Sequence, residues 1–202
     1  MTLALWILAA YLLGATPTSY LAAKLGRGID LRQHGSKNLG ATNVYRVLGW
    51  KYAIPVGLID VAKGAVPVVL FGRWAAGPAW LPVALGIAAV MGHVYSPYVR
   101  FQGGKGVATA AGMFLALGPL ALAVSVPVWG LTLWLTGYVS ASSLVAAALF
   151  PLWVRLTEPG ARPTFWAAVV LALLIVYSHR ANIRRLLAGT ESRFRTRRGV
   201  AT

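Results

Sequence analysis

Long apolar segments alternate with short polar segments along almost the whole chain. A helix of about 20 apolar residues is long enough to cross the hydrocarbon core of a bilayer. The pattern therefore predicts an all-α integral membrane protein. Because no domain boundary, linker or internal repeat is evident, residues 1–202 are expected to form one domain. The apolar segments lie at about 3–23, 52–72, 79–99, 106–136, 139–155 and 164–179.

The fourth apolar segment, 106–136, is too long for one crossing. As a single helix it would extend about 45 Å, whereas the hydrocarbon core is about 30 Å thick. Gly118 and Pro119 interrupt it, and a proline inside a helix removes a hydrogen bond and disturbs the preceding turn. Splitting the segment there predicts about seven transmembrane helices, of which 106–117 is short and is expected to be tilted or partly re-entrant.

The cationic residues predict the orientation of these helices. Cytoplasmic loops carry an excess of Lys and Arg, so the cation-rich regions are expected on the cytoplasmic side. With seven crossings, the N-terminus then lies outside and the C-terminus in the cytoplasm. The first span is followed rather than preceded by its cations, Lys24 and Arg27, which favours an uncleaved span over a signal peptide. The cations concentrate in 24–51, in 100–105 and beyond residue 179, the last three being Arg195, Arg197 and Arg198.

Composition narrows the kind of ligand. The chain is 58% hydrophobic, its mean hydropathy is +0.68, and its 19 Lys and Arg residues against 4 acids give a formal net charge of +15. Because most cations flank apolar spans, anionic lipid or a small anion is favoured over nucleic acid. There is no cysteine, which excludes disulfides and thiolate metal sites. No closely spaced carboxylates and no HExxH motif occur, so neither a metal nor a cofactor is expected.

Three polar segments on the predicted cytoplasmic face carry the candidate chemistry. The first, GSKNLGATNVYR at 35–46, combines two glycines with neutral hydrogen-bonding side chains and two cations. Asn43 is expected to cap a short interfacial helix through Leu48. The alternative interpretation of the segment is an ordinary solvated loop with a cap. The candidates in this segment are Gly35, Ser36, Lys37, Asn38, Thr42, Asn43 and Arg46.

The second segment, FQGGKGVAT at 101–109, surrounds Lys105 with Gly103, Gly104 and Gly106 at the start of a predicted helix. Exposed backbone N–H groups, a helix N-terminus and a lysine together form a cradle for phosphate. It is not a nucleotide-binding Walker A loop, because Gly106 replaces the Ser or Thr after the lysine. A flexible connector with a positive-inside lysine is the alternative.

The third segment, HRANIRRLLAGTE at 179–191, places His179 and Asn182 on one helical face, with Arg184 and Arg185 pointing elsewhere. A structural histidine is the alternative. The loop GYVSASS at 137–143, which contains Ser140 and Ser143, is expected to join the three segments.

Two charged residues lie inside an apolar segment. Asp60 and Lys63 are three positions apart, and a lone charge there would be costly, so an internal ion pair is expected. His93, on the next span, is expected to contact either the core or the site.

Taken together, the three segments resemble the acyl-phosphate-dependent glycerol-3-phosphate acyltransferases of bacteria, the PlsY family, over nearly the whole chain. The resemblance lies, in order, in GSKNLGATNVYR, GHVYSPYVRFQGGKGVAT and HRANIRRLLAGTE; IDVAKG and GYVSASS are also similar. It implies transfer of a fatty acyl group from acyl-phosphate to the 1-hydroxyl of sn-glycerol 3-phosphate, giving lysophosphatidic acid and phosphate. This is the first step of phospholipid synthesis. The implied location is the bacterial cytoplasmic (inner) membrane, and a monomer is expected.

The resemblance also suggests residue roles. Lys105 with its neighbouring glycines matches the family's glycerol-phosphate site, Glu191 matches a structural position, and Lys37 stands where the family usually has glycine. The expected catalytic residues are Ser36, Arg46, Lys105, His179 and Asn182. The expected substrate-binding residues are Gly35, Lys37, Asn38, Thr42, Asn43, Gly103, Gly104, Gly106, Ser140 and Ser143, and the expected structural residues are Asp60, Lys63 and Glu191.

Two other functions compete with acyl transfer. A phosphate or organophosphate transporter would also need an anion site, but transporters commonly show repeats and bind near the membrane midplane. Here the polar segments gather at one face, which favours an enzyme at the interface. A basic scaffold for anionic lipid would explain the charge, but not the three segments rich in glycine and asparagine.

Overall fold

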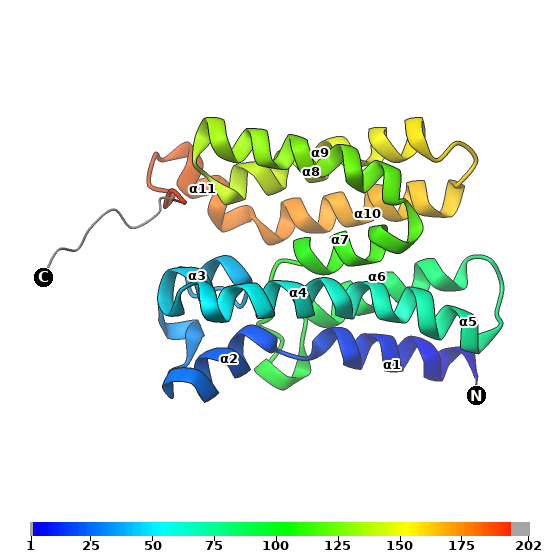
Figure 1. The fold of residues 1–202 in the computed structure, drawn as a ribbon, viewed down its shortest axis with the longest axis horizontal. Coiled ribbons are helices and arrows are strands. Elements are labelled where there is room, and N and C mark those ends of the chain that lie inside the picture. Colours follow the sequence, from blue (N-terminus) through cyan, green and yellow to red (C-terminus); the bar gives the residue numbers. More distant parts are fainter. Residues whose placement is uncertain (1, 195–202) are drawn as a thin grey trace, which may run out of the picture.

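The computed structural model describes residues 2–194, and within this range the regular elements are all helical (Figure 1). The predicted all-α class is therefore confirmed. Arg195, Arg197 and Arg198, which contributed to the predicted orientation, lie outside the described residues. The α-helices are α1 (Leu3–Ala15), α2 (Thr18–Arg27), α3 (Ala41–Leu48), α4 (Trp50–Val66), α5 (Gly72–Ala75), α6 (Leu81–Val94), α7 (Val107–Leu117), α8 (Pro119–Thr136), α9 (Val139–Thr157), α10 (Arg162–Ser178) and α11 (Arg180–Leu187). Short 3₁₀ turns occur at Leu31–Gln33 and Pro97–Val99, and a π-helical stretch, Pro67–Phe71, joins α4 to α5.

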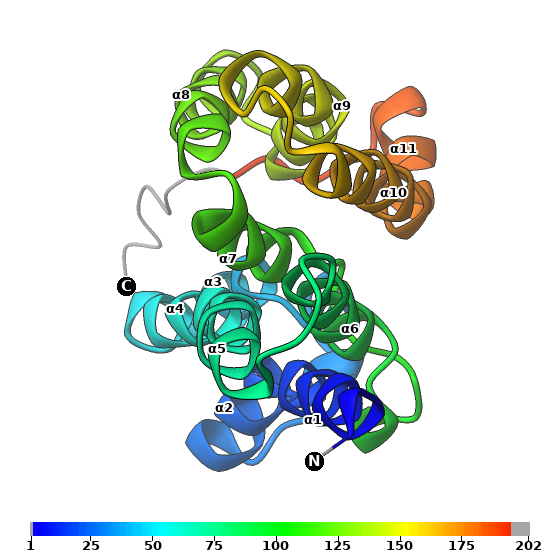
Figure 2. The same ribbon diagram turned by 90° about the vertical axis from the view of Figure 1, so that its right-hand side faces the viewer.

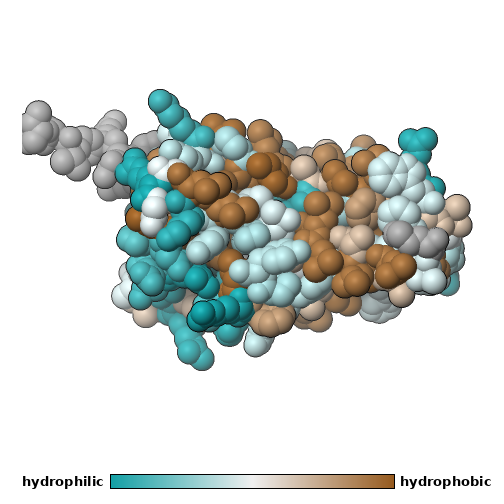
Figure 3. All heavy atoms as spheres, turned by 90° about the horizontal axis from the view of Figure 1, so that it is seen from below, coloured by the Kyte–Doolittle hydropathy of each residue, from teal (hydrophilic) through white to brown (hydrophobic). Residues whose placement is uncertain are grey.

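The helices form two layers with α7 between them (Figure 2). One layer contains α1, α2, α4 and α6, and the other contains α8, α9 and α10. Helix α1 packs along α6, α4 along α7, α8 along α9, and α9 along α10. The end of the molecule that carries α3 and α11 is rich in hydrophilic residues, whereas much of the face in Figure 3 is hydrophobic.

Five helical segments of the described chain are long and apolar enough to span a membrane. Helices α10 and α11 add a sixth if they are taken as one span that bends by 58°. Helix α7 has 11 residues, or about 16 Å of rise, and is shorter than a bilayer core. The predicted short segment therefore exists as a separate helix, and the number of seven crossings stays a prediction. The five segments are Leu3–Arg27, Trp50–Ala75, Leu81–Val99, Pro119–Thr136 and Val139–Thr157.

Two apolar segments are broken by a proline. The break at Gly118 and Pro119 was predicted and is confirmed, because α7 ends at Leu117 and α8 begins at Pro119. The break between α1 and α2, at Thr16 and Pro17, was not predicted. There, the carbonyl oxygen of Ala15 accepts a hydrogen bond from the Ser96 hydroxyl at 2.6 Å, and that of Thr16 accepts one from Lys63 Nζ at 3.0 Å. Side chains from other elements thus satisfy the carbonyl groups that the break releases.

Glycines hold α7 against α4. A Cβ atom at Gly64 would overlap the backbone carbonyl of Thr109, and one at Gly112 would overlap that of Val61. Small residues let two helix backbones approach closely in a membrane protein. This contact fixes α7 and, with it, the glycine-rich segment that leads into α7.

Candidate active site

A cavity of about 380 Å³ extends from the polar end of the molecule into the space between the two layers. Its deeper walls are apolar and come from α7, α8, α9 and α10. Its polar end brings together all three segments singled out by the sequence. The expected site residues that line it are Ser36, Asn38, Thr42, Asn43, Arg46, Lys105, Gly106, Ser140, Ser143, His179 and Asn182, together with Asp60 and Glu191. Gly35, Lys37, Gly103 and Gly104 lie in the same loops but do not line it.

Asn43 shapes the first loop. Its side chain is buried, its Oδ1 accepts a hydrogen bond from the backbone N–H of Ser36 at 2.8 Å, and its Nδ2 donates to the carbonyl oxygens of His34 and Asn38, both at 3.0 Å. The prediction that Asn43 caps the following helix is wrong, because α3 begins at Ala41 and Asn43 lies in its first turn. The amide instead folds the loop onto the helix and positions Ser36 at the cavity.

The backbone of the first loop is left-handed at two positions, with φ 59° at Gly35 and 61° at Lys37. For a residue other than glycine, this conformation costs about 1–2 kcal/mol. A glycine at the position of Lys37 would avoid this cost. The Lys37 side chain is exposed and does not line the cavity, so its expected role in substrate binding stays a prediction.

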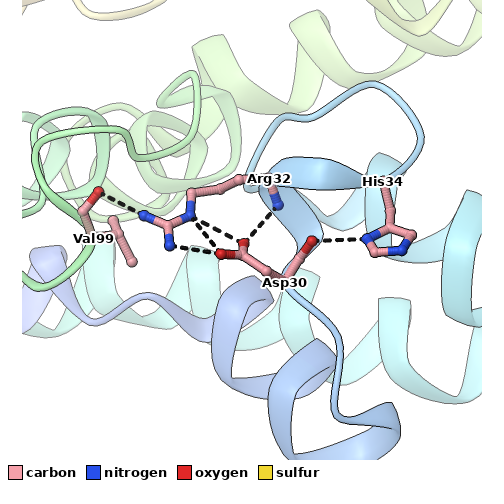
Figure 4. A network of polar contacts seen from close by, with 4 residues as sticks. All are labelled: Asp30, Arg32, His34 and Val99. Carbon is pink, nitrogen blue, oxygen red and sulfur yellow. Dashed lines mark hydrogen bonds and ion pairs between the residues drawn. The ribbon is translucent and has the colours of Figure 1, made fainter.

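The outer edge of this loop is held by an ion pair that the sequence did not single out (Figure 4). Arg32 Nη2 lies 2.7 Å from Asp30 Oδ2, and Arg32 Nη1 donates to the carbonyl oxygen of Val99 at 3.4 Å. The hydrogen bonds from Arg32 lower the pKa of Asp30 to about 2. This contact ties the first loop to the segment that follows α6.

The glycine-rich segment lies directly on the end of α6. The N–H of Gly103 donates to the carbonyl oxygen of Val94 at 3.1 Å, and that of Gly104 to the carbonyl oxygen of His93 at 3.0 Å. A Cβ atom at Gly103 would overlap the backbone of His93, and one at Gly104 would overlap its ring. These two N–H groups therefore form hydrogen bonds inside the protein. The expectation that they are exposed to a phosphate is wrong. A phosphate cradle here depends on Lys105, Gly106 and the N-terminus of α7.

Lys105 and Asn182 belong to one hydrogen-bonded network. Lys105 Nζ donates to Asn182 Oδ1, and Asn182 Nδ2 donates to Glu191 Oε1 at 2.6 Å. The Ser140 hydroxyl donates to the same carboxylate oxygen at 2.7 Å, and Arg185 Nε donates to Glu191 Oε2 at 2.6 Å. The interpretation that Arg185 points away from the site is therefore wrong. Glu191 connects α9 and α11 to Lys105, as a structural residue would.

The electrostatics of this network favour an anion. Burial lowers the pKa of Lys105 to about 8, while Glu191 raises it and Arg185 and Arg46 lower it further. Burial also lowers the pKa of Arg46. For Glu191, burial raises the pKa, but hydrogen bonds from neighbours, Ser140 first, outweigh this effect and lower it overall. An anion near Lys105 would restore the proton that burial disfavours.

Residues 191–194 close the polar end, and apart from Glu191 their role was not predicted from the sequence. Arg46 Nη2 donates to the carbonyl oxygen of Ser192 at 3.1 Å, and the N–H of Phe194 donates to the carbonyl oxygen of Gly137 at 2.6 Å. The Phe194 ring packs on Tyr45, with the ring centroids 4.9 Å apart. The segment that follows α11 thereby connects α3 to the turn before α9.

Two further expectations concern α9 and His179. The segment 137–143 is not a loop, because α9 begins at Val139; Ser140 and Ser143 therefore face the cavity from a helix. His179 lies at the bend between α10 and α11, and its Nδ1 is 2.8 Å from the carbonyl oxygen of Ile175. A carbonyl oxygen can only accept, so Nδ1 carries a proton and neutral His179 retains Nε2 as an acceptor.

Below the glycine-rich segment lies the expected internal ion pair, which is confirmed. Lys63 Nζ is 2.8 Å from Asp60 Oδ1, and both side chains are buried. The Thr18 hydroxyl donates to the same oxygen at 2.5 Å, and His93 Nδ1 lies 3.8 Å from it. His93 is buried and also lines the cavity, so it belongs to both the core and the site.

Known proteins match almost the full length of the chain. A sequence model of the glycerol-3-phosphate acyltransferase family matches residues 4–189. The glycerol-3-phosphate acyltransferase of Chlorobium luteolum is 41% identical over 96% of this chain and 97% of its own, and that of Desulforudis audaxviator is 50% identical over 94% of each. The crystal structure of PlsY, an integral membrane glycerol 3-phosphate acyltransferase, in its glycerol 3-phosphate form gives a TM-score of 0.90 at 39% identity over 96% of each chain. Its lysophosphatidic acid form gives a TM-score of 0.85 at 37% identity.

Proposed function

The chain belongs to the glycerol-3-phosphate acyltransferase family and is an acyltransferase, and we propose that it transfers a fatty acyl group from acyl-phosphate to the 1-hydroxyl of sn-glycerol 3-phosphate. The products are lysophosphatidic acid and phosphate. The observation that carries the proposal is the shape of the cavity, which has a cationic polar end and an apolar extension. A donor with a phosphate head and a fatty chain has the same two parts.

Charge screening is the first task of such a site. Each substrate carries a phosphate with up to about two negative charges near neutral pH, and two such groups repel strongly where the dielectric is low. Lys105 and Arg46 both line the polar end of the cavity. In the proposed arrangement, Lys105 and the N-terminus of α7 bind glycerol phosphate, and Arg46 screens the phosphate of the donor.

The chemistry then depends on positioning. Acyl-phosphate is a mixed anhydride, so its leaving group is phosphate rather than an alkoxide. The 1-hydroxyl oxygen attacks the acyl carbon, the bond from that carbon to the phosphate oxygen breaks, and the departing phosphate takes the hydroxyl proton. Ser36, His179 and Asn182 hold the reactants, and the cations stabilise the developing charge.

We also propose that the polar end faces the cytoplasm of a bacterial inner membrane, with seven crossings in a monomer. The cations gathered at this end support that orientation. The chain has no cysteine, so single cysteines introduced at Thr2 and at Thr190 can be labelled selectively; both positions are exposed. They are expected to label from opposite sides of sealed vesicles. Labelling from the same side would reject an odd number of crossings.

The donor is tested with purified protein, glycerol 3-phosphate and either palmitoyl phosphate or palmitoyl-CoA. We expect lysophosphatidic acid only with palmitoyl phosphate, because the glycine-rich segment does not match a nucleotide-binding loop. Equal or faster turnover with palmitoyl-CoA would overturn the proposed donor. Uptake of labelled glycerol 3-phosphate into sealed vesicles without lipid product would instead favour a transporter.

A further inference from the structure

Two phenylalanines, Phe114 on α7 and Phe150 on α9, line the apolar part of the cavity. Their ring centroids are 4.4 Å apart and their planes are inclined by 47°, a favourable arrangement for two aromatic rings. Both side chains line the cavity, yet both are buried, with exposed fractions of 4% and 8%. On the basis of the proposed acyl transfer, we infer that this pair limits the length of the acyl chain that the enzyme accepts.

On α7 and α9, the wall between the polar end and the pair consists mainly of small side chains. Ala110 and Ala111 lie one helical turn before Phe114, and Ala146 and Ala147 lie one turn before Phe150. Alanines therefore leave an apolar passage that leads to the two rings. These four alanines all line the cavity.

The depth of the passage fits one fatty chain. Ser140, at the polar end, and Phe150 lie on the same helix, ten positions apart, which corresponds to about 15 Å of helical rise. A bilayer core is about 30 Å thick, so each leaflet contributes about half of that depth. The pair therefore lies at a depth similar to that of one leaflet of acyl chains.

The expected selectivity comes from steric exclusion of long acyl chains rather than from burial of additional methylene groups. The donor comes from a bilayer or micelle, where its chain is already in an apolar environment, so additional methylene groups gain little in the cavity. A chain longer than the passage must displace packed rings, which is unfavourable. Leu122 and Val126 of α8 also line the cavity, and Val126 is 58% exposed. A chain that left sideways past α8 into lipid would not meet the pair at all.

The acyl-chain selectivity of variants distinguishes an acyl chain that ends at the aromatic pair from one that leaves past α8 into lipid. The assay measures kcat/KM for lauroyl, myristoyl, palmitoyl, stearoyl and arachidoyl phosphate. For the wild type, we expect a fall of about ten-fold or more from the best donor to arachidoyl phosphate, the order that forced overpacking produces. Phe114→Leu and Phe150→Leu should reduce this fall, whereas Ala146→Phe should move the optimum to shorter chains. Phe165→Leu is the matched control, because Phe165 packs against the same core but does not line the cavity.

A flat wild-type series, or the same selectivity in both leucine variants and in Ala146→Phe, would overturn the inference and indicate the sideways route. Thermal unfolding checks that each variant is folded. A thermal-shift titration with lysophosphatidic acids of the same chain lengths provides a readout without turnover, and the same shift in optimum is expected there. If acyl-phosphate is not the donor, the proposed reaction fails, while this titration still tests the aromatic pair.

Discussion

The Lys105 ammonium donates a hydrogen bond to the side-chain oxygen of Asn182, which is 77 positions away in the sequence. Asn182 in turn donates to Glu191, so a neutral amide stands between the lysine and the carboxylate. Among the described residues, Lys105 forms no direct ion pair. The lysine is thus held in place while its charge stays available to a phosphate.

This neutral link predicts the effect of a nearly isosteric change. Asn182→Asp would place a second carboxylate beside Lys105 and pair its charge, so glycerol 3-phosphate should bind less well. A hydrogen bond to a charged group contributes about 1.5–3 kcal/mol, and we expect kcat/KM for glycerol 3-phosphate to fall by about ten- to one-hundred-fold. Arg184→Ala, at an exposed position of the same helix, is the control and should stay near the wild-type value. Unchanged kcat/KM in Asn182→Asp would contradict the neutral link.

The lowered pKa of Lys105 also predicts that activity depends on pH. Burial lowers its pKa to about 8, so in the free enzyme the lysine is protonated below this pH and loses its charge as the pH rises through it. Glycerol 3-phosphate does not titrate in that range, because the second pKa of a phosphate ester is about 6. We expect kcat/KM for glycerol 3-phosphate to decline above pH 8. Lys105→Arg, whose side chain stays charged, should lack this decline even if its overall rate is lower. The same alkaline decline in that variant would assign the titration to another group.

How far the sequence predicts the fold is clear from its prolines. The break at Pro119 is predicted from the sequence, yet Pro17 also breaks a helix, whereas Pro55, Pro127 and Pro151 lie inside helices. A proline inside a helix removes one backbone hydrogen bond, whereas one in the first turn does not, and in membrane helices neighbouring groups often satisfy the freed carbonyl. The break at Pro17 depends on Ser96 and Lys63, which reach it from other elements and which the local sequence does not reveal.

The candidate site, like the fold, is predicted only in part from the sequence. Residue type and spacing were enough to select Lys105, His179 and Asn182, which the structure places around one cavity. Spacing did not reveal that the N–H groups of Gly103 and Gly104 are used by α6, or that Arg185 turns back to Glu191. Such partners are set by the packing of distant segments.

The buried ion pair of Asp60 and Lys63 predicts that the two residues contribute to stability in a strongly coupled way. Removing one member of a buried pair leaves an uncompensated charge and typically costs about 3–5 kcal/mol. We therefore expect Asp60→Asn and Lys63→Met each to lower the unfolding temperature in detergent strongly. The double variant should be more stable than the sum of the two losses predicts, because neither charge is left alone. Additive losses would show that the two side chains act independently.

The left-handed backbone at Lys37 predicts a stabilising substitution. Lys37→Gly removes strain of about 1–2 kcal/mol, and the flexibility of glycine in the unfolded chain offsets about 0.5–1 kcal/mol of it. The net expectation is a gain of up to about 1.5 kcal/mol in the free energy of unfolding. Lys51→Gly is a matched control of opposite sign, because Lys51 is exposed in the first turn of α4, where glycine weakens a helix. Destabilisation by Lys37→Gly would contradict the assigned conformation.

The last prediction concerns Ser36, which either forms an acyl-enzyme or positions a substrate. A serine nucleophile ordinarily needs an adjacent base that is oriented by a third group. His34, the histidine nearest in sequence, directs its Nδ1 to the backbone carbonyl oxygen of Asp30 at 2.9 Å, and no hydrogen bond joins the Ser36 hydroxyl to a base within residues 2–194. Acyl-phosphate is already activated, so a covalent intermediate would add little.

We therefore expect direct transfer, with Ser36→Ala lowering kcat/KM by about one-hundred-fold through lost positioning. Ser178→Ala is the control, since the Ser178 hydroxyl donates to the carbonyl oxygen of Leu174 in its own helix and does not line the cavity. The decisive experiment incubates the enzyme with chain-labelled acyl-phosphate without glycerol 3-phosphate and examines the peptide that contains Ser36. Direct transfer predicts no label on that peptide and no ping-pong kinetics. A stoichiometric ester on Ser36 that glycerol 3-phosphate discharges would make this serine the nucleophile.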